Sequence, residues 1–145
     1  MKTMPIPDFK LLFESAPGTY LVLLTDFTIA AVNDAYLKAT MTKREAIIGH
    51  NLFEIFPDNP NDNTADGVFN LRASLNFVLQ HKQPHTMPVQ KYDIRRPDGV
   101  FEERYWSPLN TPIVNQQNKV TYIIHNVTDV TASKKTAVKL KRKHF

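Results

Sequence analysis

The sequence predicts an α+β domain, an antiparallel sheet with helices against one of its faces. Three observations lead to this prediction. The 145 residues are enough for one hydrophobic core but not for two. Candidate strands cluster at both ends of the chain. The segments between them space their apolar residues as helices do, and this order is typical of α+β folds.

Turn-forming residues divide the first half of the chain into short elements. Residues 8–16 have helical apolar spacing and end at Pro17-Gly18, whereas residues 20–24 and 29–32 have the length and character of a strand hairpin. Capping and turn residues then predict a short helix capped by Asn33 or Asp34, a second capped by Thr42 over residues 44–48, a short apolar element at 51–56 and an exposed loop at 57–63.

The second half begins with the longest predicted helix and continues as strands. Residues 64–82 repeat apolar side chains at the helical period, and Pro84 ends the helix. Strands are predicted at 87–95, 101–113 and 119–129, with hairpin turns at 96–99 and 115–118. Residues 131–145 read as a lysine-rich helix that leaves the domain.

The net charge of +4 comes from one end of the chain. Six of the 18 basic residues follow residue 133, where no acidic residue stands, so residues 1–133 carry 12 basic and 14 acidic groups. A short basic run is more often a solvated helix face than a recognition site. We therefore expect no specific binding of nucleic acid.

The sequence lacks the chemical groups that several functional classes require. Without cysteine the chain can form no disulfide, cysteine-ligated metal site or cysteinyl–flavin bond. It contains no nucleophile elbow, phosphate loop or zinc-protease motif, so we expect no enzymatic activity. Neither a membrane-spanning run nor a secretory signal is visible, which makes a cytoplasmic location the default expectation.

Three motifs in order resemble the PAS domain family. The first is Phe13-Glu14-Ser15-Ala16-Pro17-Gly18 before the first strand, with Ala31-Val32-Asn33-Asp34-Ala35-Tyr36 after it. The second is Pro97-Asp98-Gly99 with the following strand, and the third is Asp129-Val130-Thr131. The resemblance covers residues 10–131. This segment is similar to PAS domains at the head of bacterial sensor histidine kinases. The resemblance implies a five-stranded antiparallel sheet with short helices around a pocket.

The resemblance also implies a function and a division of the chain. Residues 1–18 would be an N-terminal cap helix, 19–131 the PAS core, and 132–145 a basic output helix or linker to a kinase or other effector domain. The domain would bind a small molecule, form a homodimer, or do both, and so control the exit helix. The alternatives are a ligand-free dimerisation or interaction module with a filled core, and the PAS portion of a transcription regulator.

Strand parity, carried over from flavin-binding relatives, selects the residues expected to face the pocket. Alternate residues of a strand share one face, although a bulge in the strand at 101–113 would reverse its parity. If Arg72 faced the pocket, it would favour an acidic ligand through bidentate pairing. The expected ligand-binding residues are Gln90, Tyr92, Ile94, Trp106, Asn110, Ile123, His125 and Val127 on strands, with Leu71, Arg72 and Leu75 on the long helix.

Two further sets of residues follow from the resemblance. Asp129 and Thr131 would relay the signal, Asp129 by accepting hydrogen bonds and Thr131 by capping the exit helix. Phe9, Leu12 and Phe13 would form a dimer contact or, alternatively, cover the sheet within one subunit. No metal site is expected. Haem is disfavoured because the end of the long helix is polar and offers no apolar wall, and flavin is disfavoured because the flavin-linking cysteine is missing. A small metabolite is still an open possibility for the ligand.

Overall fold

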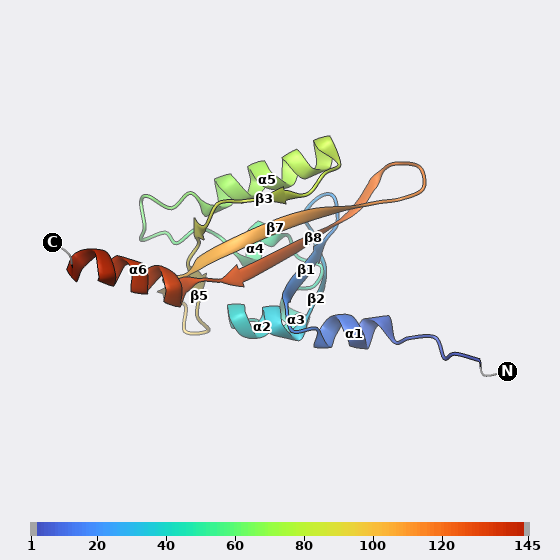
Figure 1. The fold of residues 1–145 in the computed structure, drawn as a ribbon, viewed down its shortest axis with the longest axis horizontal. Helices are drawn as coiled ribbons and strands as arrows, with labels where there is room; N and C mark the ends of the chain where they lie inside the picture. The colour runs from blue at the N-terminus through green and yellow to red at the C-terminus, as the bar shows by residue number, and fades with distance from the viewer. Residues whose placement is uncertain (1–2, 144–145) are drawn as a thin grey trace.

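The computed structural model describes residues 3–143, which fold into an α+β domain (Figure 1). The helices are α1 (Phe9–Ser15), α2 (Asp34–Thr40), α3 (Arg44–Ile47), α4 (Leu52–Ile55), α5 (Gly67–His81) and α6 (Thr131–Lys143). The strands are β1 (Thr19–Leu23), β2 (Ile29–Val32), β3 (His85–Thr86), β4 (Gln90–Lys91), β5 (Ile94–Arg95), β6 (Phe101–Glu102), β7 (Tyr105–Val114) and β8 (Val120–Asp129).

One antiparallel sheet organises the domain. Its strands lie in the order β2-β1-β8-β7-β3, and β4 also pairs with β7. The C-terminal strand β8 therefore occupies the centre, between β1 and β7. The two short strands β5 and β6 pair only with each other, as a hairpin outside this sheet. The predicted five-stranded order is present, with β3 and β4 together in the place of one edge strand.

The helices between β2 and β3 and the inner face of the sheet enclose the core. On β8 buried residues alternate with more exposed ones, and Ile123, His125 and Val127 point inward. Opposite them, α5 packs against β7 and β8 through its apolar stripe of Leu71, Leu75 and Val78. This alternation is the period-2 pattern that the sequence predicts.

The predicted strand at 87–95 is only partly confirmed, because it is divided into β4 and β5 and the chain leaves the main sheet between them. Of this segment, only β4 forms a strand pair with β7. Asp93, which follows β4, has a buried carboxylate that needs hydrogen-bond partners. Asp93 Oδ1 accepts from the backbone N–H of Arg104 at 3.3 Å. Arg104 lies where the predicted strand 101–113 is interrupted, between β6 and β7.

Three local predictions also need correction. The loop at 57–63 is only partly exposed, and it holds the start of α5 because Asp58 Oδ1 accepts from the backbone N–H of Val68. Helix α5 begins at Gly67 and not at residue 64, and the Tyr92 ring packs where a side chain at Gly67 would stand. Helix α3 follows Lys43 without a side-chain cap, so Thr42 does not cap it.

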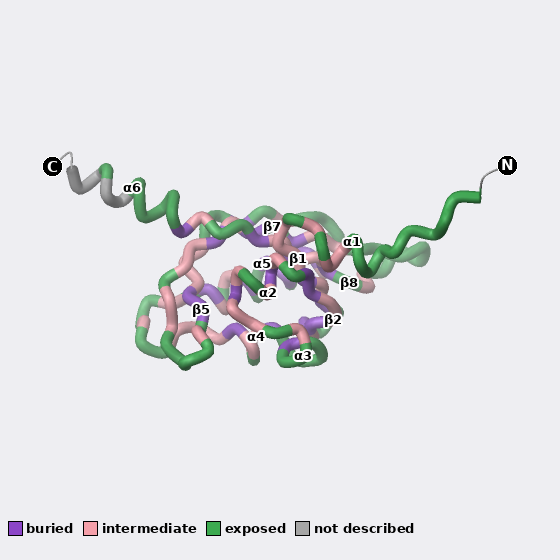
Figure 2. The backbone as a smooth tube through the Cα atoms, turned by 90° about the horizontal axis from the view of Figure 1, so that it is seen from below, coloured by how far each residue is buried: buried purple, intermediate pink, exposed green. Residues whose placement is uncertain are grey.

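The terminal helices extend from opposite ends of the domain (Figures 1 and 2). No residue of α1 is buried, and α6 continues directly from the central strand β8. Residues 144–145 of the predicted output segment 132–145 lie outside the described residues, as do residues 1–2 of the predicted cap segment. Within residues 3–143, no helix has the length and apolar character needed to cross a membrane.

Candidate functional site

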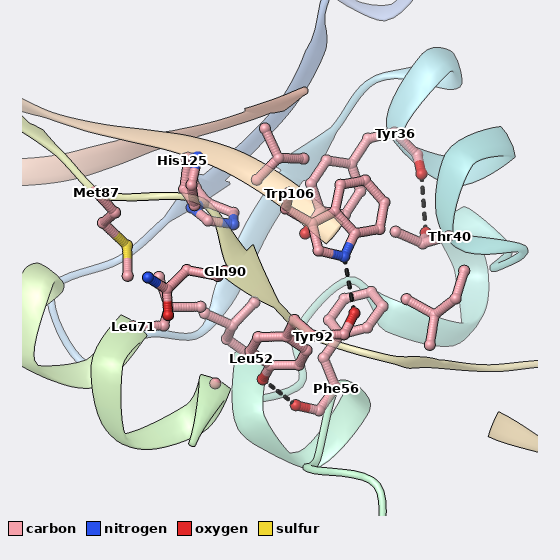
Figure 3. Close-up of a pocket in the computed structure, with 14 residues that line it drawn as sticks. Tyr36, Thr40, Leu52, Phe56, Leu71, Met87, Gln90, Tyr92, Trp106 and His125 are labelled. Atoms are coloured by element: carbon pink, nitrogen blue, oxygen red, sulfur yellow. Dashed lines mark hydrogen bonds between the residues drawn. The ribbon is translucent and has the colours of Figure 1, made fainter. Parts of the chain in front are cut away.

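A partly open pocket, which we call the inner cavity, lies between the sheet and the helices α2, α4 and α5 (Figure 3). Its volume is about 40 Å³, room for only a few non-hydrogen atoms and far less than haem or flavin requires. The lining is mostly apolar and contains no lysine or arginine. The lining residues are Tyr36, Thr40, Leu52, Phe56, Gly67, Leu71, Met87, Gln90, Tyr92, Ile94, Trp106, Pro108, His125 and Val127.

Seven of the residues that the sequence analysis expects at a ligand line this inner cavity: Leu71, Gln90, Tyr92, Ile94, Trp106, His125 and Val127. Ile123 and Leu75 are fully buried in the core and do not line it. Asn110 is also fully buried, one step behind the lining, where it contacts His125. Trp106 and Asn110 on β7 face inward, as expected from the flavin-binding relatives. The interruption between β6 and β7 at residues 103–104 comes before Trp106 and does not reverse which residues of β7 face inward.

Arg72 does not face the inner cavity, and the expected preference for an acidic ligand loses its basis. The residue is exposed, and its guanidinium lies 4.3 Å from the centroid of the Phe53 ring. Arg72 follows Leu71 by one residue, which turns it about 100° around the helix axis and away from the cavity. Its place in the structure is thus a cation–π contact on the surface of α4.

The other lining residues were not anticipated by the sequence analysis. Tyr36 carries a signal that could have found it, because it lies three residues after the Asn33 cap and its N–H donates to Asn33 Oδ1 at 3.1 Å. That position directs the Tyr36 side chain toward the sheet. Leu52 and Phe56 could have been found from their spacing of four residues on one face of α4.

Most polar side chains on the lining already have partners. Trp106 Nε1 donates to the carbonyl oxygen of Tyr92 at 2.8 Å, and the Tyr92 hydroxyl donates to the carbonyl oxygen of Phe56. Gln90 accepts from Asn70 Nδ2 at 2.9 Å. Burial raises the pKa of the Tyr92 phenol, which therefore stays neutral. These bonds fix the shape of the wall and leave few groups free to contact a ligand.

A buried chain of hydrogen bonds leads away from His125. Asn110 stands directly opposite His125 on the neighbouring strand, and its Oδ1 lies 2.6 Å from His125 Nδ1. Asn110 Nδ2 donates to Ser74 Oγ at 2.9 Å, and Ser74 Oγ lies 2.7 Å from His85 Nδ1. Burial lowers the pKa of His125 to about 4, so its ring is neutral at pH 7.

A second and larger hollow, which we call the outer groove, has a volume of about 380 Å³. It lies between α3 and the β5–β6 hairpin, and Lys43, Arg95 and Arg96 are among its lining residues. Phe56 and Ile94 line both the inner cavity and the outer groove. These two side chains therefore separate the two spaces.

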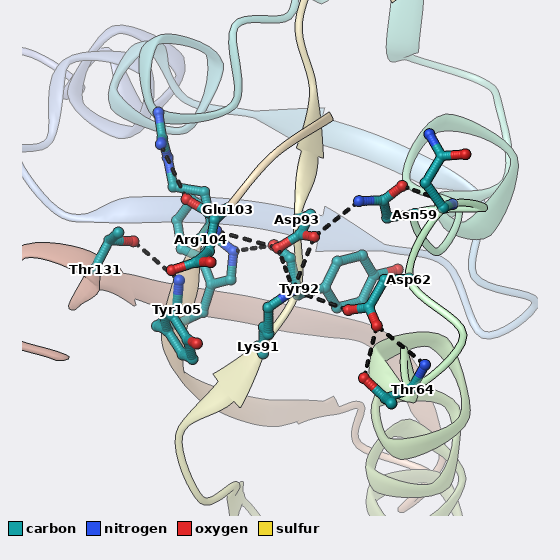
Figure 4. Close-up of polar contacts among 12 residues, drawn as sticks. Asn59, Asp62, Thr64, Lys91, Tyr92, Asp93, Glu103, Arg104, Tyr105 and Thr131 are labelled. Atoms are coloured by element: carbon teal, nitrogen blue, oxygen red, sulfur yellow. Dashed lines mark hydrogen bonds and ion pairs between the residues drawn. The ribbon is translucent and has the colours of Figure 1, made fainter. Parts of the chain in front are cut away.

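Polar contacts join the start of α6 to the end of β8 and to the start of β7, and Figure 4 shows the contact between Thr131 and Tyr105. Asp129 Oδ1 accepts from the backbone N–H of Thr131 at 2.9 Å, and Thr131 Oγ1 accepts from the backbone N–H of Tyr105 at 2.9 Å. Arg104 Nε lies 3.5 Å from Asp129 Oδ2. Asp129 thus accepts hydrogen bonds as predicted, but Thr131 is not a cap: its hydroxyl fastens the first turn of α6 to β7.

An ionic cluster fastens the loop before α5 to β4 (Figure 4). Lys91 Nζ lies 2.9 Å from Asp62 Oδ2 and 2.9 Å from Asp93 Oδ2. Asn59 Nδ2 also donates to Asp93 Oδ2 at 3.0 Å. The cluster therefore ties the segment above the cavity to the sheet at two points. No group of three or more acidic, histidine or cysteine side chains within residues 3–143 is arranged to hold a metal ion.

Two apolar side chains of α1, those of Phe9 and Leu12, are largely exposed in the subunit. Phe9 is 69% exposed and Leu12 is 59% exposed, while Phe13 is half-buried. Helix α1 packs beside α2, and Phe9 and Leu12 do not cover the sheet of their own subunit. The alternative that this helix is a simple sheet cover is therefore wrong for Phe9 and Leu12.

Comparison with known proteins assigns the family. Residues 17–132 match the family model described as PAS domain. No curated protein matches the chain. Solved structures share its fold at low identity, which by itself speaks only to the fold.

Three of these structures cover most of the chain. A sensory box sensor histidine kinase from Vibrio cholerae is 19% identical, with a TM-score of 0.58 over 85% of this chain and 88% of that one. The PAS domain of a Colwellia psychrerythraea protein is 13% identical, with a TM-score of 0.64 over 84% of this chain and 93% of that one. Drosophila melanogaster Cycle PAS-B, with bound ethylene glycol, is 16% identical, with 0.60 over 77% and 98%. Because the family match spans the whole sheet and helices α2 to α5, the chain belongs to the PAS domain family.

Proposed function

We propose that this PAS domain is the sensory and relay part of a multidomain signalling protein, most consistent with a sensor histidine kinase. A small molecule in the inner cavity, a rearrangement of a dimer, or both would alter the end of β8 and so the direction or register of α6. The proposal keeps the division into a cap at 1–18, a core at 19–131 and an output segment at 132–145.

One observation carries this proposal. The strand β8 contributes His125 and Val127 to the inner cavity and ends at Asp129, two residues before α6 begins. A change in the cavity therefore needs to travel only two to four residues along one central strand. A packed element with two arrangements at that point is sufficient for signal transfer. The Vibrio cholerae kinase is similar in fold and supports the same reading.

The size of the inner cavity favours the second candidate, a ligand-free dimerisation or interaction module. About 40 Å³ is close to a filled core, since small-molecule pockets usually span ~300–1,000 Å³. The exposed apolar residues of α1 fit a homodimer in either case. The PAS portion of a transcription regulator would use the same parts with a different effector.

Native mass spectrometry separates the two candidates. The protein is purified without added ligand, and its native mass is compared with its mass after denaturation, together with an absorption spectrum. Extra mass that disappears on denaturation supports the ligand-binding sensor and gives the size of the ligand. A bare mass, combined with a dimer, favours the ligand-free module.

A further inference from the structure

Two polar atoms on the lining of the inner cavity have no hydrogen-bond partner among the described residues: Tyr36 Oη and His125 Nε2. Both residues are only 4% exposed. Within residues 3–143, Arg104 Nε is the only fully enclosed side-chain nitrogen or oxygen atom without a hydrogen bond, so Tyr36 Oη and His125 Nε2 are not fully enclosed. Because both residues line the inner cavity, the open space beside these atoms is the cavity itself (Figure 3).

The contacts of Asn110 assign the hydrogen atom on the His125 ring. Asn110 Nδ2 is directed at Ser74 Oγ, at 2.9 Å, and at the sulfur atom of Met87, at 3.6 Å. Its Oδ1 therefore faces His125 Nδ1, and a carbonyl oxygen can only accept. The neutral ring carries its one hydrogen on Nδ1. His125 Nε2 consequently presents a lone pair to the cavity.

The two atoms together define what a ligand must supply. His125 Nε2 needs a donor, whereas the Tyr36 hydroxyl can donate or accept. The centroids of the two rings lie 6.2 Å apart, and both residues line the same cavity. An anion would find no cation on the lining and would lose its hydration without compensation. The remaining surface is apolar and suits a short hydrocarbon part.

We propose that the inner cavity binds a small neutral alcohol, whose hydroxyl group donates to His125 Nε2 and accepts from Tyr36 Oη. This assignment rests on the proposed sensory function and specifies its ligand class. A water molecule can make the same two bonds, so a hydroxyl group can replace it without loss, whereas a ketone leaves the lone pair of His125 unpaired.

Three probes of four non-hydrogen atoms each test the proposal: 2-propanol, acetone and acetate. In the ¹⁵N-labelled protein, two-bond ¹H–¹⁵N spectra report the tautomer of His125 and each titration. We expect the hydrogen on Nδ1, a saturable change at Nε2 with 2-propanol in the millimolar range, and acetone binding at least about fivefold weaker. Acetate should cause no saturable change at this ring.

Variants locate the effect. Tyr36→Phe keeps the packing of the ring and should weaken 2-propanol binding by about fivefold or more. Tyr20→Phe removes a hydroxyl from a tyrosine that does not line the cavity and should leave the affinity unchanged. Because only one oxygen is removed in each variant, both are expected to fold.

The proposal is overturned by a hydrogen on Nε2, by acetone or acetate binding as tightly as 2-propanol, or by no binding of any probe. A co-purified molecule of another class that 2-propanol does not displace would overturn the alcohol assignment and leave the sensory function standing. Conversely, saturable 2-propanol binding without any change at the amides of Thr131 and α6 would support the alcohol assignment and count against the sensory function.

Discussion

Asn110 and His125 face each other across β7 and β8, and the 2.6 Å contact between Asn110 Oδ1 and His125 Nδ1 ties the ring to a network that reaches Ser74 on α5. The pair lies at the junction of the sheet, the long helix and the inner cavity. Its protonation is therefore coupled to the stability of the whole domain.

The burial of His125 predicts a loss of stability in mild acid. Its pKa is about 4 in the folded protein against 6.5 for an ordinary histidine, so the unfolded chain binds the proton first. Above pH 6.5, where His125 is neutral in both states, the free energy of unfolding is unaffected by this histidine. As the pH falls from 6.5 toward 4, the free energy of unfolding decreases by up to ~1.4 kcal/mol per pH unit. Urea unfolding between pH 7.5 and 4.5 should show a decrease of roughly 2.5 kcal/mol from this histidine.

His125→Gln should remove this part of the pH dependence, because glutamine does not titrate. His81→Gln is the matched control, since His81 is exposed at the end of α5 and stacks on Phe77. An unchanged slope between pH 6.5 and 4 in His125→Gln would contradict the prediction.

The ion pair between Lys91 and Asp62 predicts a second loss of stability at lower pH. Hydrogen bonds from Thr64 and Lys91 lower the pKa of Asp62 to about 2, from 3.8. The charged form is therefore favoured in the folded state, and its contribution is lost as the pH falls from about 4 through 2. Asp62→Asn should flatten the unfolding free energy in that window.

Asp66→Asn is the control for Asp62, because Asp66 lies in the same loop and makes no side-chain cap bond to α5. Its acid unfolding curve should follow that of the unchanged protein. If both variants lose the same part of the curve, the effect comes from net charge and not from the cluster around Lys91.

The sequence was sufficient to predict the sheet and much of the lining, because β8 follows a simple rule. Ile123, His125 and Val127 are every second residue of the strand and alternate with the less buried Ile124 and Asn126, and period 2 places the three on one face. The edge strand was not predictable in the same way. Its course depends on the buried Asp93 carboxylate and the Arg104 backbone, two groups that meet only in the folded chain.

The helical part of the lining shows the same limit. Leu71 was predicted from the apolar period of its helix, whereas a rotation of one residue sends Arg72 to the Phe53 ring. Tyr36 comes from a helix of only seven residues, too short for its period to define a face. Its position three residues after the Asn33 cap indicates a side chain directed toward the sheet, but its contact with the His125 ring depends on how α2 packs in the folded chain.

Ile94 separates the inner cavity from the outer groove, so its truncation should join them. Ile94→Ala should cost about 2–4 kcal/mol of stability and allow benzene to reach both spaces. The methyl signals of Val127, on the inner side, and Ile47, on the outer side, should then shift with one dissociation constant. Val78→Ala, in the core but outside both linings, should lose stability without this joint shift.

The exposed face of α1 predicts that the homodimer, where it forms, depends on Phe9 and Leu12. Phe9→Glu or Leu12→Glu should weaken dimerisation by tenfold or more in analytical ultracentrifugation, because a charge replaces apolar contact area. The melting temperature should hardly change, since neither side chain is buried. Phe69→Glu, equally exposed on α5, is the control, and equal effects at both sites would place the interface elsewhere.

The bond from the Tyr105 backbone to Thr131 Oγ1 predicts that Thr131 fastens α6 to the sheet. Thr131→Val keeps the shape of the side chain but leaves the Tyr105 N–H without its acceptor, a loss of about 1 kcal/mol or more. Amide hydrogen exchange in the first turn of α6 should accelerate by roughly fivefold or more.

Asp129→Asn separates this contact from the neighbouring ion pair. Its side-chain oxygen can still accept from Thr131 N–H, so the first turn of α6 should keep its protection while the charge that faces Arg104 is lost. Thr128→Val, on the exposed face of β8, is the matched control for Thr131→Val. If Thr128→Val and Thr131→Val loosen α6 equally, the helix is held by β8 as a whole. If only Thr131→Val does, its hydroxyl is the contact that fastens the first turn of α6 to β7.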